Sequence, residues 1–499
     1  MKTAEYILAV DIGTSSCKST VFDRSGKAIV SSSCDYPVYY PAPGYAEQKP
    51  DDWWNGFCKV MGKMLAIVKP SEIAAVGIAG QGWSAIAVDK SGEVLFNNPI
   101  WMDSRAEDDC TKITCQVPPE EIFNLCGNQV APMYTTPKIL WFERQYPDVF
   151  KRMYKVLQSN SYFVYKLTGQ FTQDTSQGYG LHFFDMMSCK WDCDMALAMG
   201  INPNIMPDLY SPSQVVGTIT WAAAKATGLL EGTPVVAGGL DAACSTLGAG
   251  VVEPGQTQAQ GGTAGGMSLC LDKYIAHPKL IMGRHVVENR WLLQGGTVGG
   301  GGTLRWLKEN ILGIGYEEMS SLAAASPVGS GGLIFLPYMS GERSPIWDKN
   351  AQGVYFGLDY SKDKKDITRA IMEGVAFSLL HNVEAALEAD GEISSFNLVG
   401  GVANSPIWLQ ILADVTGKPI NIPSSDTGTN LGAAILAGIG VGIYKNAQEA
   451  VQETVNIQNT YFPNTNNHEA YQKYYKIFRS LYETTKDNMR EIAEMRNVK

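Results

Sequence analysis

The sequence lacks several signals that would assign the chain to a broad class. It has no run of lysine and arginine, and its formal net charge of -10 provides no cationic surface for nucleic acid. No apolar run approaches the roughly 18 residues of a membrane span. Residues 1–10 do not combine the basic region, apolar stretch and cleavage site of a signal peptide. We therefore expect a cytoplasmic protein that binds neither nucleic acid nor membranes.

Metal, disulfide and two nucleotide signatures are also missing. The ten cysteines contain no CxxC pair, and the five histidines show no zinc-ligand spacing relative to them. We expect reduced, mostly buried thiols. The chain has no GxxxxGK[ST] motif and no GxGxxG motif within a βαβ unit, which argues against the P-loop and Rossmann classes.

The pattern of apolar residues indicates two similar halves. A chain of 499 residues exceeds one ordinary core, since domains average roughly 150 residues. Strands mixed with amphipathic helices predict α/β sheets covered by helices, and we place the halves at residues 1–250 and 251–499. The predicted strands are 6–12, 17–23, 28–33, 75–79, 85–89, 234–240, 267–271 and 396–399. The predicted helices are 52–68, 242–247, 366–389, 406–416 and 467–496.

Four glycine-rich turns could approach a ligand closely. The segment Asp11 to Ser16 follows a strand and combines backbone N–H groups, hydroxyls and a carboxylate, which suits phosphate oxygens and hydrated Mg²⁺. Residues 261–263, Gly-Gly-Thr, offer a similar turn from the other half. Glycines at 299–302 and 400–401 add further places of close approach. Each could be a plain turn, but four together favour a nucleotide held between the halves.

Asp241 stands where the predicted strand 234–240 gives way to a helix. Neighbouring glycines and alanines leave room for a ligand. A carboxylate there could accept a proton from an acceptor hydroxyl, or it could simply cap the helix. Its position alone leaves both roles open.

Two longer motifs carry a family resemblance. Residues 133–145 read Met-Tyr-Thr-Thr-Pro-Lys-Ile-Leu-Trp-Phe-Glu-Arg-Gln. Residues 353–358 read Gly-Val-Tyr-Phe-Gly-Leu, and residues 366–373 follow as Asp-Ile-Thr-Arg-Ala-Ile-Met-Glu. Both resemble signatures of the FGGY family of carbohydrate kinases, in the actin-like ATPase superfamily, and the resemblance runs from end to end. It implies two actin-like (ribonuclease H-like) domains around a nucleotide cleft.

The resemblance also implies an activity and a set of residue roles. The activity is transfer of phosphate from ATP, with Mg²⁺, to a sugar hydroxyl. Asp241 would be the catalytic base, and Asp11 and Asp241 would lie near the metal. The first half would hold the sugar and the second the adenosine. The implied nucleotide residues are Gly13, Thr14, Ser15, Gly262, Thr263, Gly301, Gly400, Gly401 and Asn404. The implied sugar residues are Gln81, Gly82, Trp83, Trp101, Asp103, Arg105 and Asp241.

The sequence leaves the sugar open. Residues 333–345 resemble xylulokinases, which favours a ketopentose such as D-xylulose and a 5-phosphate product. However, residues 81–84 read Gln-Gly-Trp-Ser, where D-xylulose kinases usually carry Gln-Met-His-Gly. L-xylulose, another ketose, a polyol or a sugar acid stay open as substrates.

Simpler alternatives also remain for individual residues and for the whole chain. Trp83 and Trp101 could be core aromatics, and Asp103 and Arg105 could pair with each other on one side of an extended segment. The chain could instead be an actin-like ATPase that acts on a partner, or an inactive binding protein. Apart from a small-molecule substrate, a second copy in a homodimer is the one partner that we consider.

Overall fold

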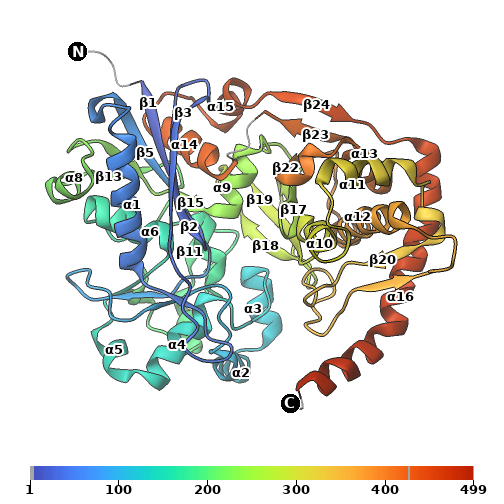
Figure 1. Ribbon diagram of the computed structural model, residues 1–499. Helices are drawn as coiled ribbons and strands as arrows, with labels where there is room; N and C mark the ends of the chain where they lie inside the picture. Colours follow the sequence, from blue (N-terminus) through green and yellow to red (C-terminus); the bar gives the residue numbers. More distant parts are fainter. Residues whose placement is uncertain (1–4, 425–427, 498–499) are drawn as a thin grey trace.

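Two mixed β-sheets, each covered by helices, form the framework of the molecule (Figure 1). The computed structural model describes residues 5–424 and 428–497. The first sheet contains β1 (Tyr6–Ile12), β2 (Ser16–Phe22), β3 (Ala28–Asp35), β5 (Ile73–Gly80), β13 (Val215–Thr218), β14 (Pro234–Val236) and β15 (Gly239–Leu240). The second contains β16 (Gln256–Gly261), β17 (Gly265–Leu271), β18 (Ile281–Arg284), β19 (Trp291–Thr297), β22 (Ser395–Val399), β23 (Ile420–Pro423) and β24 (Ile457–Tyr461).

The two sheets share one topology. In the first, β1, β2 and β3 form an antiparallel meander, and β5 and then β14 continue parallel to β1 on its other side. In the second, β16, β17 and β19 form the meander, and β22 and β23 continue parallel to β16. The predicted pair of actin-like α/β sheets is therefore confirmed. The boundary near residue 250 stays a prediction.

One face of the first sheet is covered by α1 (Pro50–Met64). Apolar residues at helical spacing, such as Trp53 and Phe57, pack on Leu8 and Val10 of β1. Pro50 at the first helical position and acidic residues in the first turn favour the start of this helix. The helix ends at Met64 instead of residue 68, because the N–H groups of residues 67 and 68 turn back to the Met64 carbonyl.

The predicted strand 234–240 is wrong as a single strand. Gly238 interrupts it with φ +74°, a conformation that favours glycine. A Cβ at Gly238 would lie 1.9 Å from the Ile78 carbonyl oxygen. The chain therefore divides into β14 and β15, and α9 (Asp241–Gly248) begins directly after Leu240. This break brings Asp241 to the end of the first sheet.

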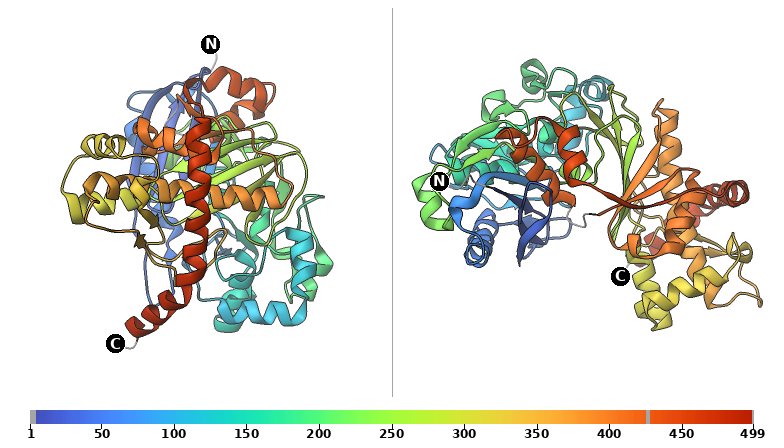
Figure 2. Two further views of the ribbon diagram at one scale, coloured as in Figure 1. Left: turned by 90° about the vertical axis from the view of Figure 1, so that its right-hand side faces the viewer. Right: turned by 90° about the horizontal axis from the view of Figure 1, so that it is seen from above.

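The other face of the first sheet is covered by a segment from the second half of the chain. α14 (Gly428–Gly440) lies between α9 and β5, and α15 (Ala447–Thr454) follows it (Figures 1 and 2). A Cβ at Gly432 would lie 1.9 Å from the Cys244 carbonyl oxygen, and one at Gly77 would lie 2.0 Å from the Ala433 carbonyl oxygen. Asn430 also donates a 2.9 Å hydrogen bond to Thr20 Oγ1 of β2. Residues 428–454 therefore pack with the first sheet.

The second sheet is covered by α12 (Lys364–Glu388), α13 (Pro406–Thr416) and α16 (Thr465–Asn497), close to the predicted ranges. A buried ion pair joins Arg369 and Glu373 within α12 at 2.7 Å, and Tyr471 of α16 donates to Glu373 at 2.7 Å. This network holds the C-terminal helix on the second half.

The remaining elements complete the layers and connections. The other helices are α2 (Glu107–Gln116), α3 (Pro119–Cys126), α4 (Thr135–Gln145), α5 (Pro147–Arg152), α6 (Ser159–Thr168), α7 (Cys193–Ala198), α8 (Trp221–Thr227), α10 (Gly301–Leu307) and α11 (Tyr316–Ala325). The short strand pairs are β4 (Glu47–Gln48) with β7 (Asn98–Pro99), β6 (Ile86–Val88) with β8 (Lys155–Leu157), β9 (Thr172–Asp174) with β12 (Asp208–Tyr210), β10 (Phe184–Asp185) with β11 (Lys190–Trp191), and β20 (Ile334–Leu336) with β21 (Val354–Phe356).

Two further sequence expectations can be compared with the structure. The ten cysteines are free, and five of them are buried, fewer than the mostly buried thiols that we expected. Within residues 5–424 and 428–497, no helix combines the length and the apolar character needed to cross a membrane.

The backbone contact between α9 and α14 leads to a stability prediction. Gly432→Ala should destabilise the protein by about 1–3 kcal/mol, because the added methyl group would displace the Cys244 carbonyl. Gly62→Ala is the matched control, since Gly62 lies in α1 with nothing within 4 Å of its added Cβ. It should stabilise by roughly 0.5–1 kcal/mol. Urea unfolding of both variants measures the difference, and equal effects would contradict the close packing.

Candidate active site

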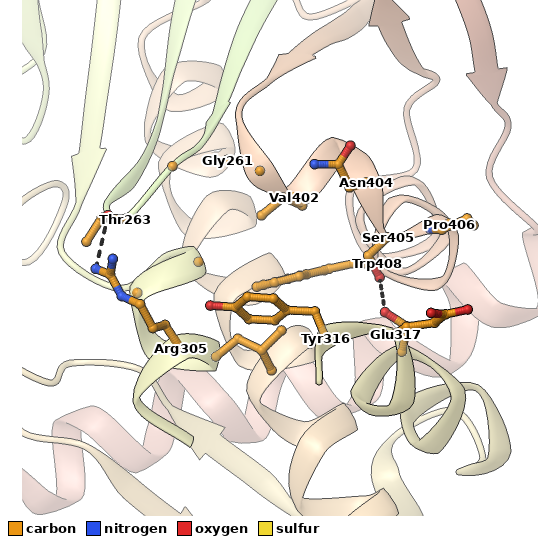
Figure 3. Close-up of a pocket in the computed structure, with 16 residues that line it drawn as sticks. Gly261, Thr263, Arg305, Tyr316, Glu317, Val402, Asn404, Ser405, Pro406 and Trp408 are labelled. Carbon is orange, nitrogen blue, oxygen red and sulfur yellow. Dashed lines mark hydrogen bonds between the residues drawn. The ribbon is translucent and has the colours of Figure 1, made fainter. Parts of the chain in front are cut away.

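A pocket of about 790 Å³ lies in the second half, where three glycine segments meet (Figure 3). It is lined by Gly262, Thr263, Gly301, Gly401 and Asn404, all of them residues singled out from the sequence. The structure therefore gathers these five predicted nucleotide residues at one cavity, and their role there stays a prediction.

The glycine segments are in direct backbone contact. Gly301 N–H donates to the Gly262 carbonyl at 2.8 Å, and Gly302 N–H donates to the Thr263 carbonyl at 3.0 Å. Gly400 has φ +101°, and a Cβ there would lie 2.7 Å from the Gly261 carbonyl carbon. Side chains at these positions would separate the three segments, so glycine is required for the shape of the cavity.

The same pocket contains residues that the sequence analysis missed. Tyr316 at the start of α11 and Trp408 of α13 line it and offer aromatic surface (Figure 3). Ser320 and Ser405, one from each side, share a 3.0 Å hydrogen bond. These residues belong to no recognisable motif, so no signal in the sequence singles them out.

The turn at Gly13–Ser15 connects β1 to β2 in the first half. Tyr36 OH donates to the Gly13 carbonyl at 2.5 Å, which fixes the turn. Thr14 Oγ1 donates to Gln81 Oε1 at 3.2 Å and accepts from Trp101 Nε1 at 2.9 Å. The structure therefore joins a predicted phosphate-turn residue to two predicted sugar residues.

Two carboxylates, Asp11 and Asp241, lie near each other at the end of the first sheet. Asp11 is the penultimate residue of β1. Asp241 is the first residue of α9, where its Oδ1 accepts a 2.6 Å hydrogen bond from Ala242 N–H. Leu240 occupies the cap position, so Asp241 is not the helix N-cap. Burial raises the pKa of Asp241 to about 6. Burial, followed by the neighbouring charge of Asp241, raises the pKa of Asp11 to about 8, although Lys18 acts in the opposite direction.

The surroundings of Asp11 fit a cation. Its Oδ1 is buried and has no hydrogen-bond partner among the described residues. Carboxylate oxygens are the ligands that Mg²⁺ prefers, usually one or two of them together with water and phosphate oxygens. No group of three or more acidic, histidine or cysteine side chains that could hold a metal is found in residues 5–424 and 428–497. Any cation at Asp11 and Asp241 would therefore need ligands from water or a bound nucleotide.

Lys138 ties together three segments around the predicted sugar residues. Its buried ammonium group donates to the carbonyls of Trp83, Ile100 and Met133 at 2.8, 2.9 and 2.8 Å. Burial lowers the pKa of Lys138 to about 7. Trp83 has φ +59°, which is unusual for a bulky residue and indicates backbone strain. The three hydrogen bonds hold this strained turn in place.

Trp83 extends an aromatic cluster toward Asp241. Its ring meets Tyr134 edge-on at 4.8 Å and Tyr179 at 5.8 Å between centroids. Burial raises the pKa of Tyr179, and the charges of Tyr134 and Asp241 add to this shift. A Cβ at Gly82 would lie 2.8 Å from the Leu240 side chain. Residues 81–83 therefore lie next to the start of α9, although Trp83 is largely buried, as the core alternative expected.

Asp103 and Arg105 form the mutual ion pair that was the alternative to sugar binding. Arg105 Nε lies 2.8 and 2.9 Å from the two Asp103 oxygens, and its Nη2 lies 3.1 Å from Glu47. Asp103 also accepts from Ala46 N–H at 2.6 Å, and the guanidinium lies 4.1 Å from the Tyr45 ring centroid. Because these groups are buried and directed at protein partners, the pair supports the loop. Contact with a sugar stays a prediction.

Comparison with known proteins gives the family. The N-terminal domain of the FGGY family of carbohydrate kinases matches residues 6–248, and its C-terminal domain matches residues 262–441. The chain is 29% identical to the xylulose kinase of Bacillus subtilis (strain 168), covering 97% of this chain and 98% of the relative. It is 30% identical to that of Staphylococcus epidermidis (strain ATCC 12228), covering 99% of both chains.

Solved structures agree with this result. A ligand-bound xylulose kinase from Lactobacillus acidophilus aligns with a TM-score of 0.91 at 25% identity, over 98% of this chain and 99% of that one. A gluconate kinase from the same species aligns with a TM-score of 0.90 at 26% identity, over 96% and 98%. The resemblance inferred from the two motifs is confirmed, and the chain belongs to the FGGY family of carbohydrate kinases, which are phosphotransferases.

Proposed function

We propose that this kinase transfers the γ-phosphoryl group of ATP to a hydroxyl of a ketopentose, with D-xylulose as the first candidate and its 5-phosphate as the product. The observation that carries the reaction is Asp241, a carboxylate at the start of α9 beside a second carboxylate and an aromatic cluster. The choice of sugar is supported by relatives named xylulose kinase that match over nearly their whole length.

Asp241 accepts the proton of the acceptor hydroxyl in this proposal. With a pKa of about 6, the carboxyl is largely ionised at pH 7 and yet more basic than an ordinary aspartate. Its place at the junction of β15 and α9 lets the hydroxyl approach from the side of residues 81–83. Removal of the proton as the bond to phosphorus forms makes the sugar oxygen a better nucleophile.

We assign the nucleotide to the pocket of the second half and to the turn of the first. The adenosine would lie against Gly400, Gly401 and Asn404, with the aromatic side chains of Tyr316 and Trp408 at the cavity wall. The phosphates would reach the turns at residues 13–15 and 262–263, beside Gly301. ATP would then bridge residues 1–250 and 251–499.

The metal proposed with ATP is Mg²⁺. Asp11 and Asp241 would hold it through their oxygens or through bound water, consistent with the unpaired Oδ1 of Asp11. Bound there, it would neutralise charge on the phosphate oxygens.

The acceptor pocket is assigned to the first half. Gln81, Gly82, Trp83 and Trp101 would line it next to Asp241. Lys138 would act through these residues by fixing their backbone. We place Asp103 and Arg105 behind them as support, because their charged atoms already bind protein groups.

A sugar acid is the second candidate acceptor. The gluconate kinase that aligns at a TM-score of 0.90 supports it, together with residues 81–84, which differ from the usual D-xylulose kinase pattern. L-xylulose, another ketose or a polyol stays open as a substrate, because its hydroxyl would give its proton to Asp241 in the same way. A partner-driven ATPase would need no acceptor pocket and is therefore disfavoured.

The catalytic proposal predicts the behaviour of Asp241→Asn. The variant should fold and bind ATP normally, but phosphorylate the preferred sugar at least ~100-fold more slowly, because the amide cannot accept the proton. Release of ADP is measured with D-xylulose, L-xylulose, gluconate and a pentitol, which also identifies the sugar. A near-parental rate in Asp241→Asn would exclude Asp241 as the base, and a parent that prefers gluconate would replace the proposed ketopentose.

The metal proposal predicts proton release. Asp11, with a pKa of about 8, is mostly protonated at pH 7, and a bound cation would lower that pKa. Binding of Mg²⁺ and ADP at pH 7 should therefore release about one proton, whereas little release is expected near pH 9, where Asp11 is already ionised. Titration calorimetry in buffers of different ionisation enthalpy counts the protons. Asp11→Asn is the control, and unchanged release in it would assign the protons to other groups.

The support proposal predicts the effect of Asp103→Asn. Loss of this buried charge should lower the free energy of unfolding by about 3 kcal/mol, because Arg105 would keep only one of its two carboxylate partners, Glu47. The control is Asp108→Asn, because exposed Asp108 lies 3.7 Å from Arg144 and should contribute under about 1 kcal/mol. Urea unfolding compares the two. Parental stability of Asp103→Asn together with a raised KM for sugar would instead show that Asp103 contacts the substrate.

A further inference from the structure

Arg343 is a partly buried cation for which the described residues supply no partner. It lies in the loop between β20 and β21, and no ion pair or hydrogen bond joins its guanidinium to residues 5–424 or 428–497. Burial lowers its pKa, although the charge of neighbouring Glu342 acts in the opposite direction. By contrast, Arg105 and Arg369 are each paired with carboxylates. A partly buried guanidinium group without a carboxylate hydrogen-bonded to it favours an anionic ligand.

The guanidinium lies on one identifiable face of the second sheet. A Cβ at Gly296 of β19 would lie 2.8 Å from Arg343 Nη2, so the side chain packs directly on this glycine. Gln294, two residues earlier, points to the same face. Gln294 Nε2 donates to Ser268 Oγ at 3.1 Å, and Ser268 stands opposite Gln258 in the register of β16 and β17.

That face is the one that carries α9. Gln258 Nε2 donates to Ser245 Oγ at 2.8 Å, and Gln258 Oε1 accepts from Thr246 Oγ1 at 2.9 Å. Both residues belong to α9, whose first residue is Asp241. Arg343 therefore lies on the face of the second sheet against which α9 packs, the helix that begins at Asp241.

The guanidinium is also close to the glycine turn of the second half. Gly296 pairs with Gly266, and Gly266 pairs with Gln260, the residue directly before Gly261. Glu342 Oε1 accepts from Val298 N–H at 2.7 Å and from Arg343 N–H at 2.8 Å. These two bonds anchor the loop to the segment that leads into Gly299–Gly302 and direct this carboxylate oxygen at the backbone.

We propose that Arg343 is a further catalytic residue, which binds the phosphoryl group while it passes from ATP to the acceptor. The inference rests on the proposed kinase reaction. The acceptor oxygen forms a bond to phosphorus, and the bond from phosphorus to the β,γ-bridging oxygen breaks with its electron pair remaining on ADP. The acceptor proton goes to Asp241. Arg343 is unchanged and neutralises charge on the phosphoryl oxygens, for which its planar fork of donors is suited.

A carboxylate of the sugar is a less suitable ligand for Arg343. The guanidinium is connected to the glycine turn through the row of Gly296, Gly266 and Gln260. The proposed acceptor residues, in contrast, lie in the first half, Gln81 to Trp83 directly after β5 and Trp101 shortly after β7. The experiment must therefore distinguish binding of the phosphoryl group by Arg343 from binding of a sugar carboxylate.

The experiment compares Arg343→Gln and Arg343→Lys with the parent protein. Binding of Mg²⁺ and ADP is measured with and without aluminium fluoride, which mimics the transferring phosphoryl group and requires no knowledge of the sugar. Hydrolysis of ATP without sugar is the second readout. Arg490→Gln is the control for the change of charge, because Arg490 lies exposed on α16.

We expect Arg343→Gln to bind ADP within about threefold of the parent and to lose about 100-fold in affinity for the fluoride complex and in ATP hydrolysis. Arg343→Lys should lie between the two, and added guanidinium should restore part of the activity of Arg343→Gln. Equal weakening of ADP and of the fluoride complex would overturn the inference, as would parental behaviour in both assays.

Two further outcomes separate this inference from the proposed function. If Arg343→Gln raises only the KM for gluconate, Arg343 binds a sugar carboxylate and the inference is wrong. If the parent protein does not phosphorylate D-xylulose, but Arg343→Gln still binds the fluoride complex about 100-fold more weakly than the parent, the inference about Arg343 holds and only the assigned sugar is wrong.

Discussion

The burial of two neighbouring carboxyl groups, Asp11 and Asp241, is the constraint on which the arrangement of this molecule depends. Both are held at the end of the first sheet, where burial raises their pKa values, and no cationic side chain of the described residues is hydrogen-bonded to either. Left to itself, such a pair would turn toward water, because burial disfavours the charged form of each carboxyl group. It stays together because α9 is fixed from several sides, by the break at Gly238, by α14 along its length and by Gln258 of the second sheet. In the proposed mechanism, this loss of stability is accepted for a site that would attract a cation.

The two halves of the molecule line their candidate binding regions with different chemical groups. In the second half, backbone forms the part of the cavity wall where glycines at three places in the chain touch one another. The first half uses side chains, among them the buried ammonium of Lys138, which satisfies three carbonyls at once. A backbone wall suits phosphate groups, which bind N–H donors, whereas an aromatic and amide wall suits a sugar. The two halves therefore present groups that suit different parts of the proposed reaction, the phosphates in one case and the sugar in the other.

Local signals in the sequence were sufficient for much of this description. The meander, the glycine turns and the long helices depend on the spacing of apolar residues and on turn-forming residues. The sequence predicts each of them close to its observed range. Features that depend on a distant neighbour were not predicted. The break at Gly238 arises from the approach of Ile78, and Tyr316 reaches the pocket proposed for the nucleotide only through the packing of α11. The spacing of Asp103 and Arg105 fitted both a ligand site and an ion pair, and the part that Glu47 takes in the ion pair is visible only in three dimensions.

The packing of α14 and α15 on the first sheet has a consequence for synthesis of the protein on the ribosome. Strands β1 to β15 emerge early, but the helix that covers one face of β1 and β5 is made only after most of the second half. During that interval, the nascent first half presents the apolar side of its sheet, including Ile7 and Ala9. Such exposed surface is prone to aggregation. The chain therefore cannot finish its domains in the order in which they are translated, and the last step of folding must return to the first strands made.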